Sequence, residues 1–205
     1  ETIDGVSVRT IGANAFNGNW NLIYLTLPEG LTAIEDGAFE SAYQLSFVEF
    51  PSTLRTIGNR AFYNYRGGKL MLPEGLERIG DEAFYRCSVR GTLELPEGLK
   101  EIGDSAFARS IFMRTLDLPS TLEIIGEHAF EDVSLSYVYM DGLTPPKVAK
   151  TAFAECTSLA DIELNEYCTK QQMLDMQAII DEAGLNCRVW RYENTQTSMA
   201  KGASY

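Results

Sequence analysis

A six-residue motif, Ile-Gly-x-x-Ala-Phe, recurs along most of the chain and limits the folds that this chain can adopt. It begins at Ile11, and Glu35 replaces its glycine in one copy. Successive copies are 22 or 23 residues apart. A fixed period over six steps is the signature of a solenoid, in which each repeat is one structural unit. The last copy is degenerate and keeps only the Ala-Phe. The seven copies end at Phe16, Phe39, Phe62, Phe84, Phe107, Phe130 and Phe153.

A second element keeps the same period and places an apolar-x-apolar triplet before a proline. Its first copy is Leu25-Thr26-Leu27-Pro28, and Ile162-Glu163-Leu164 continues it without proline. The alternation predicts a short strand with one face inward. The residues after the proline, Glu-Gly or Ser-Thr, are typical of a turn, and the Leu-x-x-Ile that follows predicts a second short strand. The leucines of this second strand form one column: Leu31, Leu54, Leu76, Leu99 and Leu122.

Each repeat is therefore a coil that is too small to bury its own apolar residues. We expect residues 1–164 to form a solenoid of about seven coils, mostly short β-strands with a single helical or 3₁₀ turn at each Ala-Phe. The glycine of Ile-Gly would permit a bend, and the Asp or Asn after it in four repeats would cap the turn. The seven Phe side chains would then form a continuous core. With strands about 4.8 Å apart, seven coils span roughly 35 Å.

The consensus Ala-Phe-x-x-Cys-x-x-Leu-x-x-Ile-x-Leu-Pro-x-x-Leu-x-x-Ile-Gly resembles the BspA-type leucine-rich repeat, also called the Treponema pallidum type. The resemblance covers roughly Ile3 to Leu164. It implies a leucine-rich-repeat solenoid, and it implies a bacterial protein that is secreted or at the cell surface. Some members resemble adhesins that attach to extracellular matrix proteins. Because one fold hosts many functions, the resemblance does not identify a ligand.

The repeat stops after Leu164, and residues 165–192 predict a helix and a strand that cap the open end of the solenoid. Thr169 and Gln172 have the spacing of a capping box, and Gly184 is a typical helix stop. A partner-binding helix is the alternative. We expect residues 193–205 to be a loose tail and more protein to precede residue 1, where the chain starts within a repeat. The apolar stripe of the helix is Met173, Met176, Ile179, Ile180 and Ala183.

The net charge of -12 excludes some classes of partner. Nucleic-acid binding depends on Lys and Arg that displace counterions, so we expect no nucleic-acid partner. Attachment to an anionic lipid surface is disfavoured for the same reason. No apolar run approaches the roughly 18 residues of a membrane-spanning helix. A signal peptide is not visible in this chain.

The cysteines and the single histidine do not predict a metal site or a cofactor. Cys87 and Cys156 share one position of the repeat three coils apart, too far for a disulfide, so we interpret both as small core residues. Cys168 and Cys187 flank the predicted helix, and whether they are bridged stays open. His128 lies in a column of unlike residues, which indicates a surface position. No zinc motif, phosphate loop or nucleophile motif is present.

Two carboxylates, Glu94 and Asp117, occupy equivalent strand positions on neighbouring coils, about 5 Å apart by the strand spacing. That separation suits a retaining glycosidase. Catalysis would also need a pocket and a raised pKa, which an open row of side chains does not provide. We therefore predict no enzymatic activity. Calcium binding to these carboxylates is a minor alternative, and carbohydrate binding or hydrolysis is a distant third function.

The outward positions of the first strand do not face the core, so packing does not determine their residue types. Those residue types therefore carry information about function. Exposed aromatics on a rigid sheet suit contact with a protein or glycan. The simpler explanation of these aromatics is that aromatic residues favour strands and shield the hydrogen bonds of the sheet from water. We predict a surface or secreted module that binds a protein, with a host extracellular matrix protein as the candidate partner. The alternative is a structural spacer that presents another domain. The candidate ligand-binding residues are Tyr24, Phe47, Lys69, Glu94, Asp117, Tyr137 and Tyr139.

Overall fold

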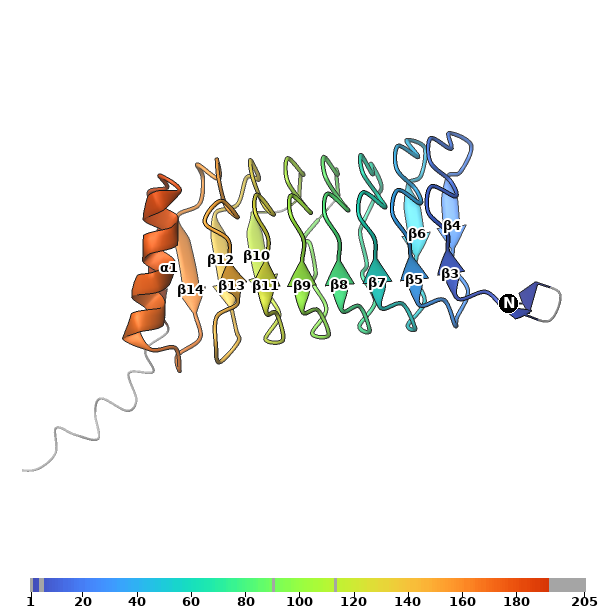
Figure 1. Cartoon of the computed structure of the whole chain (residues 1–205). Coiled ribbons are helices and arrows are strands. Elements are labelled where there is room, and N and C mark those ends of the chain that lie inside the picture. Colours follow the sequence, from blue (N-terminus) through green and yellow to red (C-terminus); the bar gives the residue numbers. More distant parts are fainter. Residues whose placement is uncertain (1, 4–5, 90, 113, 192–205) are drawn as a thin grey trace, which may run out of the picture.

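The computed structural model describes residues 2–3, 6–89, 91–112 and 114–191. The repeats form a stack of coils along one axis, with helix α1 (Lys170–Glu182) at one end and the amino terminus at the other (Figure 1). Two short strands, β1 (Thr2–Ile3) and β2 (Val6–Ser7), form an antiparallel hairpin before the first coil. The tail predicted at 193–205 lies outside the described residues.

The second strand of each coil builds a parallel sheet of seven strands, in which neighbouring strands come from consecutive coils. Ile11 lies opposite Ile34, and Ile34 opposite Ile57, so the isoleucine column keeps its register. Period-two alternation turns these isoleucines inward. The strands are β3 (Thr10–Ile11), β5 (Ala33–Ile34), β7 (Thr56–Ile57), β8 (Arg78–Ile79), β9 (Glu101–Ile102), β11 (Ile124–Ile125) and β13 (Lys147–Val148).

The first strands form a second parallel layer that is interrupted in its middle. Single bridges, Met71 to Glu94 and Glu94 to Asp117, connect the third, fourth and fifth coils there. Gly68 and Gly91 lie just before the bridged residues of the third and fourth coils, and glycine is depleted in strands. One sheet contains β4 (Tyr24–Thr26) and β6 (Phe47–Glu49), and the other contains β10 (Thr115–Leu118), β12 (Tyr137–Met140), β14 (Asp161–Leu164) and β15 (Arg188–Arg191).

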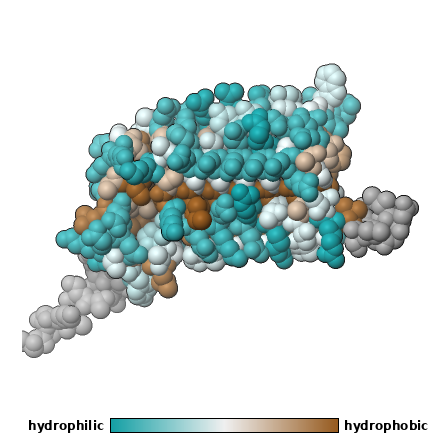
Figure 2. Space-filling model, in the orientation of Figure 1, coloured by the Kyte–Doolittle hydropathy of each residue, from teal (hydrophilic) through white to brown (hydrophobic). Residues whose placement is uncertain are grey.

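The phenylalanine column forms a stacked spine through the core. Consecutive rings are nearly parallel, with centroids 5.1 to 5.6 Å apart. Six of the seven side chains, from Phe39 to Phe153, are at most 2% exposed. Phe16 differs from the expectation because it is only partly buried: it lies in the first coil and stacks on one side, against Phe39. Figure 2 shows a hydrophobic band along the long axis between hydrophilic rims.

The segment around each Ala-Phe differs from the helical or 3₁₀ turn that we expected. In the third coil the N–H of Tyr63 donates to the carbonyl of Arg60, which closes a tight turn, whereas the N–H of Phe62 donates to Ala83 in the next coil. Arg60 and Asn64 have φ angles of +56° and +64°. Left-handed residues interrupt a right-handed helix, so alternate N–H groups turn outward and join the coils.

The Asp or Asn after Ile-Gly also bonds between coils instead of capping its own turn. The Asp81 carboxylate accepts a hydrogen bond of 3.0 Å from the N–H of Asp104, and the Asp104 carboxylate accepts one of 2.7 Å from Glu127. This close approach explains the glycine. A Cβ at Gly103 would lie 2.5 Å from Oδ1 of Asp81 and 2.8 Å from its backbone nitrogen. Glycine is thus required by the neighbouring coil more than by a bend of its own backbone.

The carboxyl-terminal residues continue the stack and then cover it. Helix α1 begins with the capping box of Thr169 and Gln172 that the sequence predicts, and Gly184, at φ +71°, follows its end. Strand β15 pairs with β14 and extends the first-strand sheet. All four cysteines are buried and unbridged, so Cys168 and Cys187 form no disulfide.

Candidate functional site

The outward side of the first strands is the surface that the sequence singles out, and we call it the strand face. Tyr24 and Phe47 are in register on β4 and β6, and both side chains are exposed, Tyr24 by 74%. Thr26 and Glu49 lie beside them and share a hydrogen bond of 3.2 Å. The two aromatic side chains therefore stand together at the amino-terminal end of the face, above a sheet whose other side is core.

The middle of the strand face is polar and internally paired. The Lys69 ammonium lies 3.0 Å from the Glu94 carboxylate, and both side chains are at least half exposed. Glu94 is bridged to Asp117, so the two carboxylates proposed as a glycosidase pair are neighbours in register. Both are exposed, and Lys69 already neutralises Glu94. An open, solvated pair of this kind lacks the enclosed pocket that general acid catalysis needs.

The carboxyl-terminal part of the strand face combines aromatic and acidic side chains. Tyr137 lies opposite Asp161, and Tyr139 lies opposite Glu163. Strand β15 then adds two residues that the sequence columns left out, because they ended at the last repeat. Arg188, opposite Asp161, places its guanidinium 2.6 Å from that carboxylate. Trp190 lies opposite Glu163 and is 39% exposed; a closing strand was predicted here, but its place on this face was not.

A cavity of about 320 Å³ lies where β12 and β14 end. Burial raises the pKa of Glu163, and the nearby carboxylates of Asp141 and Asp161 raise it further. Like charges that crowd together disfavour ionisation. Three carboxyl side chains thus line the cavity, those of Asp141, Glu163 and Glu166, together with the aromatic ring of Tyr139. Its lining residues are Tyr139, Asp141, Glu163, Leu164, Asn165 and Glu166.

Two more exposed aromatics adjoin the amino-terminal end of the strand face. Trp20 and Tyr43 each lie four residues after a spine phenylalanine, on consecutive coils, and are 76% and 53% exposed. Reasoning from the strands alone missed them, because they precede the strand. Their sequence signal is short, because the same position is aromatic only in the first two coils and is Arg66 in the third.

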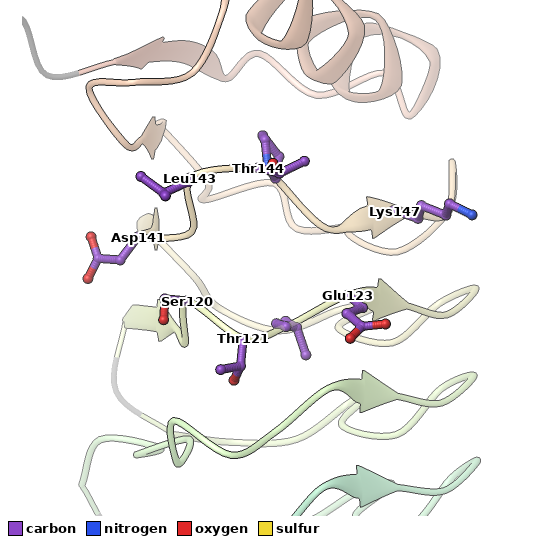
Figure 3. Close-up of a pocket in the computed structure, with 9 residues that line it drawn as sticks. Ser120, Thr121, Glu123, Asp141, Leu143, Thr144 and Lys147 are labelled. Carbon is purple, nitrogen blue, oxygen red and sulfur yellow. The ribbon is translucent and has the colours of Figure 1, made fainter.

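A groove of about 560 Å³ separates the proline turns of the fifth and sixth coils (Figure 3). Pro145 stands there in register with Leu122, so one leucine of the core column is missing. The side chains of Asp141 and Lys147 lie at opposite ends of the groove. Between them, the Ser120 hydroxyl already donates to Glu97, at 2.8 Å. The groove is thus a packing interruption in which no set of reactive groups converges.

At the Ala-Phe turns of the second to fourth coils, charged side chains pair with one another. The Arg60 guanidinium binds the carboxylates of Glu40, at 2.5 Å, and Glu82, and it lies 4.0 Å from the ring centroid of Tyr63. The hydrogen bond to Glu40 is the main reason why the pKa of Arg60 is raised. Tyr63 stacks on Tyr85 with centroids 5.1 Å apart. These aromatics are engaged with each other, unlike those of the strand face.

The remaining sequence candidates lie apart from the strand face. His128 lies at the surface, where its side chain is 41% exposed, and its Nδ1 lies 2.8 Å from a carboxylate oxygen of Glu131. Cys87 and Cys156 direct their sulfur atoms at the carbonyls of Phe62 and Phe130, at 3.4 and 3.0 Å. Within the described part of the chain, no three His, Cys, Asp or Glu residues form a group that could hold a metal ion. Nor is any described helix long and apolar enough to cross a membrane.

The comparisons with known proteins give one family and several solved structures. A family model described as the BspA type leucine rich repeat region matches residues 9–136 and 78–175, with six copies. No curated protein matches the chain significantly.

Three similar solved structures are bacterial. The Treponema pallidum leucine rich repeat protein is 20% identical, with 87% of this chain and 79% of that chain covered and a TM-score of 0.48. A Bacteroides ovatus leucine-rich repeat protein is 18% identical, with 78% and 59% covered and a TM-score of 0.37. A leucine rich cell surface protein from Faecalibacterium prausnitzii is 18% identical, with 94% and 65% covered and a TM-score of 0.39. This chain thus spans less than two thirds of the latter two, and likeness at this level carries no information about function.

Proposed function

The chain belongs to the BspA-type leucine-rich repeat family, and from that premise we propose that it is a non-enzymatic module that binds a protein ligand across the strand face. This repeat family is typical of protein–protein interaction modules. The family resemblance supports a bacterial protein that is secreted or at the cell surface, with an adhesin-like role toward a host extracellular matrix protein.

The observation that carries the proposal is the set of large aromatic side chains on the strand face that the core does not use. Tyr24, Phe47, Tyr137 and Trp190 are each at least 39% exposed, although their strands are held by a stacked core. Rigid, exposed aromatics contribute most of the binding energy in many protein interfaces, because they bury large area at little cost in conformational entropy. At the Ala-Phe turns, by contrast, Tyr63 and Tyr85 stack on each other.

The test is a binding screen of the immobilised chain against purified extracellular matrix proteins. A variant with Tyr24, Phe47, Tyr137 and Tyr139 all changed to Ala should weaken a detected interaction by roughly 30-fold or more, as for truncated interface anchors. Tyr63→Ala with Tyr85→Ala is the matched control, because it removes two tyrosines from the turn surface. Unchanged affinity in the four-residue variant would exclude the strand face as the site.

A spacer that presents another domain is the second candidate function, and the regular, elongated stack of coils favours it (Figure 1). A spacer needs no ligand of its own. It would be supported if the screen finds no partner while removal of the solenoid from the full-length protein abolishes the function of an attached domain.

A further inference from the structure

The strand face is unequal in charge along its length, and this inequality bears on what binds there. Glu49 is hydrogen-bonded to Thr26 at the amino-terminal end, and Lys69 neutralises Glu94 in the middle of the face. From β10 to β15, one of five carboxylates has a guanidinium partner among the ion pairs of the described residues: Arg188 binds Asp161. These five are Asp117, Asp141, Asp161, Glu163 and Glu166.

Two other arginines border these strands, Arg191 and Arg114. Arg191 donates to the carbonyl of Cys168, in the segment that leads to α1. Arg114 directly precedes β10, whereas Asp141 follows β12, so the two lie at opposite ends of parallel strands. The negative potential at the carboxyl ends of β12 and β14 is therefore compensated only by Arg188 among the ion pairs of the described residues.

The acidic part is also shaped to receive a side chain. The cavity of about 320 Å³ opens between Tyr139 and the carboxylates of Asp141 and Glu163. Trp190, opposite Glu163, supplies a second exposed ring beside it. Aromatic faces attract a cation through their quadrupole, and carboxylates attract it directly. Burial is the main reason why the pKa of Glu163 is raised, and the nearby carboxylates of Asp141 and Asp161 contribute; a bound cation would offset their repulsion.

We propose that the carboxyl-terminal part of the strand face recognises a basic segment of its protein partner and seats a lysine or arginine side chain in the cavity beside Tyr139, Glu163 and Trp190. The inference rests on the proposed function and names the chemistry of the partner. An acidic or neutral segment would meet uncompensated carboxylates, so charge complementarity selects the basic one.

Octalysine labelled with a fluorophore is the probe, and fluorescence anisotropy at low and physiological salt is the measurement. The chain should bind octalysine and not octaglutamate, and salt should weaken the binding because exposed charges are screened. Asp141→Asn combined with Glu163→Gln should weaken it at least about three-fold, as expected for the loss of two partly exposed ion pairs. Trp190→Ala should weaken it by roughly two- to five-fold through the lost cation–π contact.

The matched control is Glu74→Gln combined with Glu155→Gln, which changes the net charge equally at exposed carboxylates outside the cavity. If both double variants weaken the binding of octalysine equally, the attraction is generic and the inference is overturned. Absence of octalysine binding by the unmodified chain overturns it as well.

A different result separates this inference from the proposed function. A partner found in the matrix-protein screen could lose affinity on Tyr137→Ala and Tyr139→Ala but keep it on Asp141→Asn with Glu163→Gln. In that case the strand face binds protein through its aromatics, and only the basic chemistry is wrong.

Discussion

Replacement of Gly103 by alanine tests the close contact between coils that explains the repeated glycine. Neither Gly103 nor its counterpart Gly12 has a positive φ, so alanine is tolerated by the backbone at both positions. A Cβ at Gly103 would lie 2.5 Å from Oδ1 of Asp81, 2.8 Å from its backbone nitrogen and 2.8 Å from the carbonyl carbon of Gly80. Two of these three atoms are backbone, so the coils themselves would have to separate. At Gly12 the nearest atom would be a carboxylate oxygen of Glu35, 4.0 Å away.

The two substitutions should therefore affect the free energy of unfolding differently. Overpacking costs about 1–3 kcal/mol, and lower entropy of the unfolded chain offsets about 0.4–1 kcal/mol of it. We expect Gly103→Ala to lower the free energy of unfolding by about 1–2 kcal/mol. Gly12→Ala, without the clash, should leave it unchanged or raise it by up to about 1 kcal/mol.

Urea unfolding followed by circular dichroism measures both variants, and native-state hydrogen exchange locates the effect. Protection should fall first in the coils on either side of Gly103, because a solenoid transmits strain through its neighbours. If Gly103→Ala is as stable as Gly12→Ala, the separation of the coils is not limited by this contact, and our explanation of the glycine column is wrong.

Three further predictions concern the core, the turns and the thiols. Phe107→Ala should lower the free energy of unfolding in a urea titration by about 3–5 kcal/mol, because Phe107 is buried between two rings. Phe16→Ala, in the partly exposed first coil, should lower it clearly less. Equal losses of stability would contradict the stacked spine. Ser105 has a φ of +55°, so Ser105→Gly should raise the thermal midpoint by relieving about 0.5–1 kcal/mol of backbone strain, and a lower midpoint would show that the serine side chain matters more. Burial raises the pKa of Cys156 and of Cys187 to about 11, so maleimide at pH 7 should label them only after denaturation, and mass spectrometry should find no disulfide.

The repeat predicted the fold from sequence because every coil obeys the same packing rule. Residues such as Ile34, Leu54 and Phe84 face inward in each copy, so their period alone indicates a stacked core. The capping box of Thr169 is equally local, because it depends on residues three apart. What sequence reasoning missed was contact between copies. The left-handed backbone of Arg60, and the bonds of Asp81 to the next coil, depend on a neighbour that a single repeat does not show.

The candidate site was predicted only in outline. The outward positions of Tyr137 and Tyr139 follow from alternation within a strand, and the structure places them in register with Asp161 and Glu163. Trp190 was missed as a member of this face because it belongs to β15, a strand outside the repeat. The register of β15 with β14 depends on the path of α1 between them, which the repeat period does not give. The cavity beside Tyr139 could not be predicted either, since it depends on how the loops after two strands diverge.

The strand face as the recognition surface is tested most directly by hydrogen–deuterium exchange of the chain with and without the partner that the matrix-protein screen identifies. Bound partner should slow exchange in peptides that contain β12, β14 and β15, whose outward residues include Tyr137, Glu163 and Trp190, and should leave the Ala-Phe turns near Tyr63 unchanged. Slower exchange confined to those turns, with the three strands unaffected, would contradict the account.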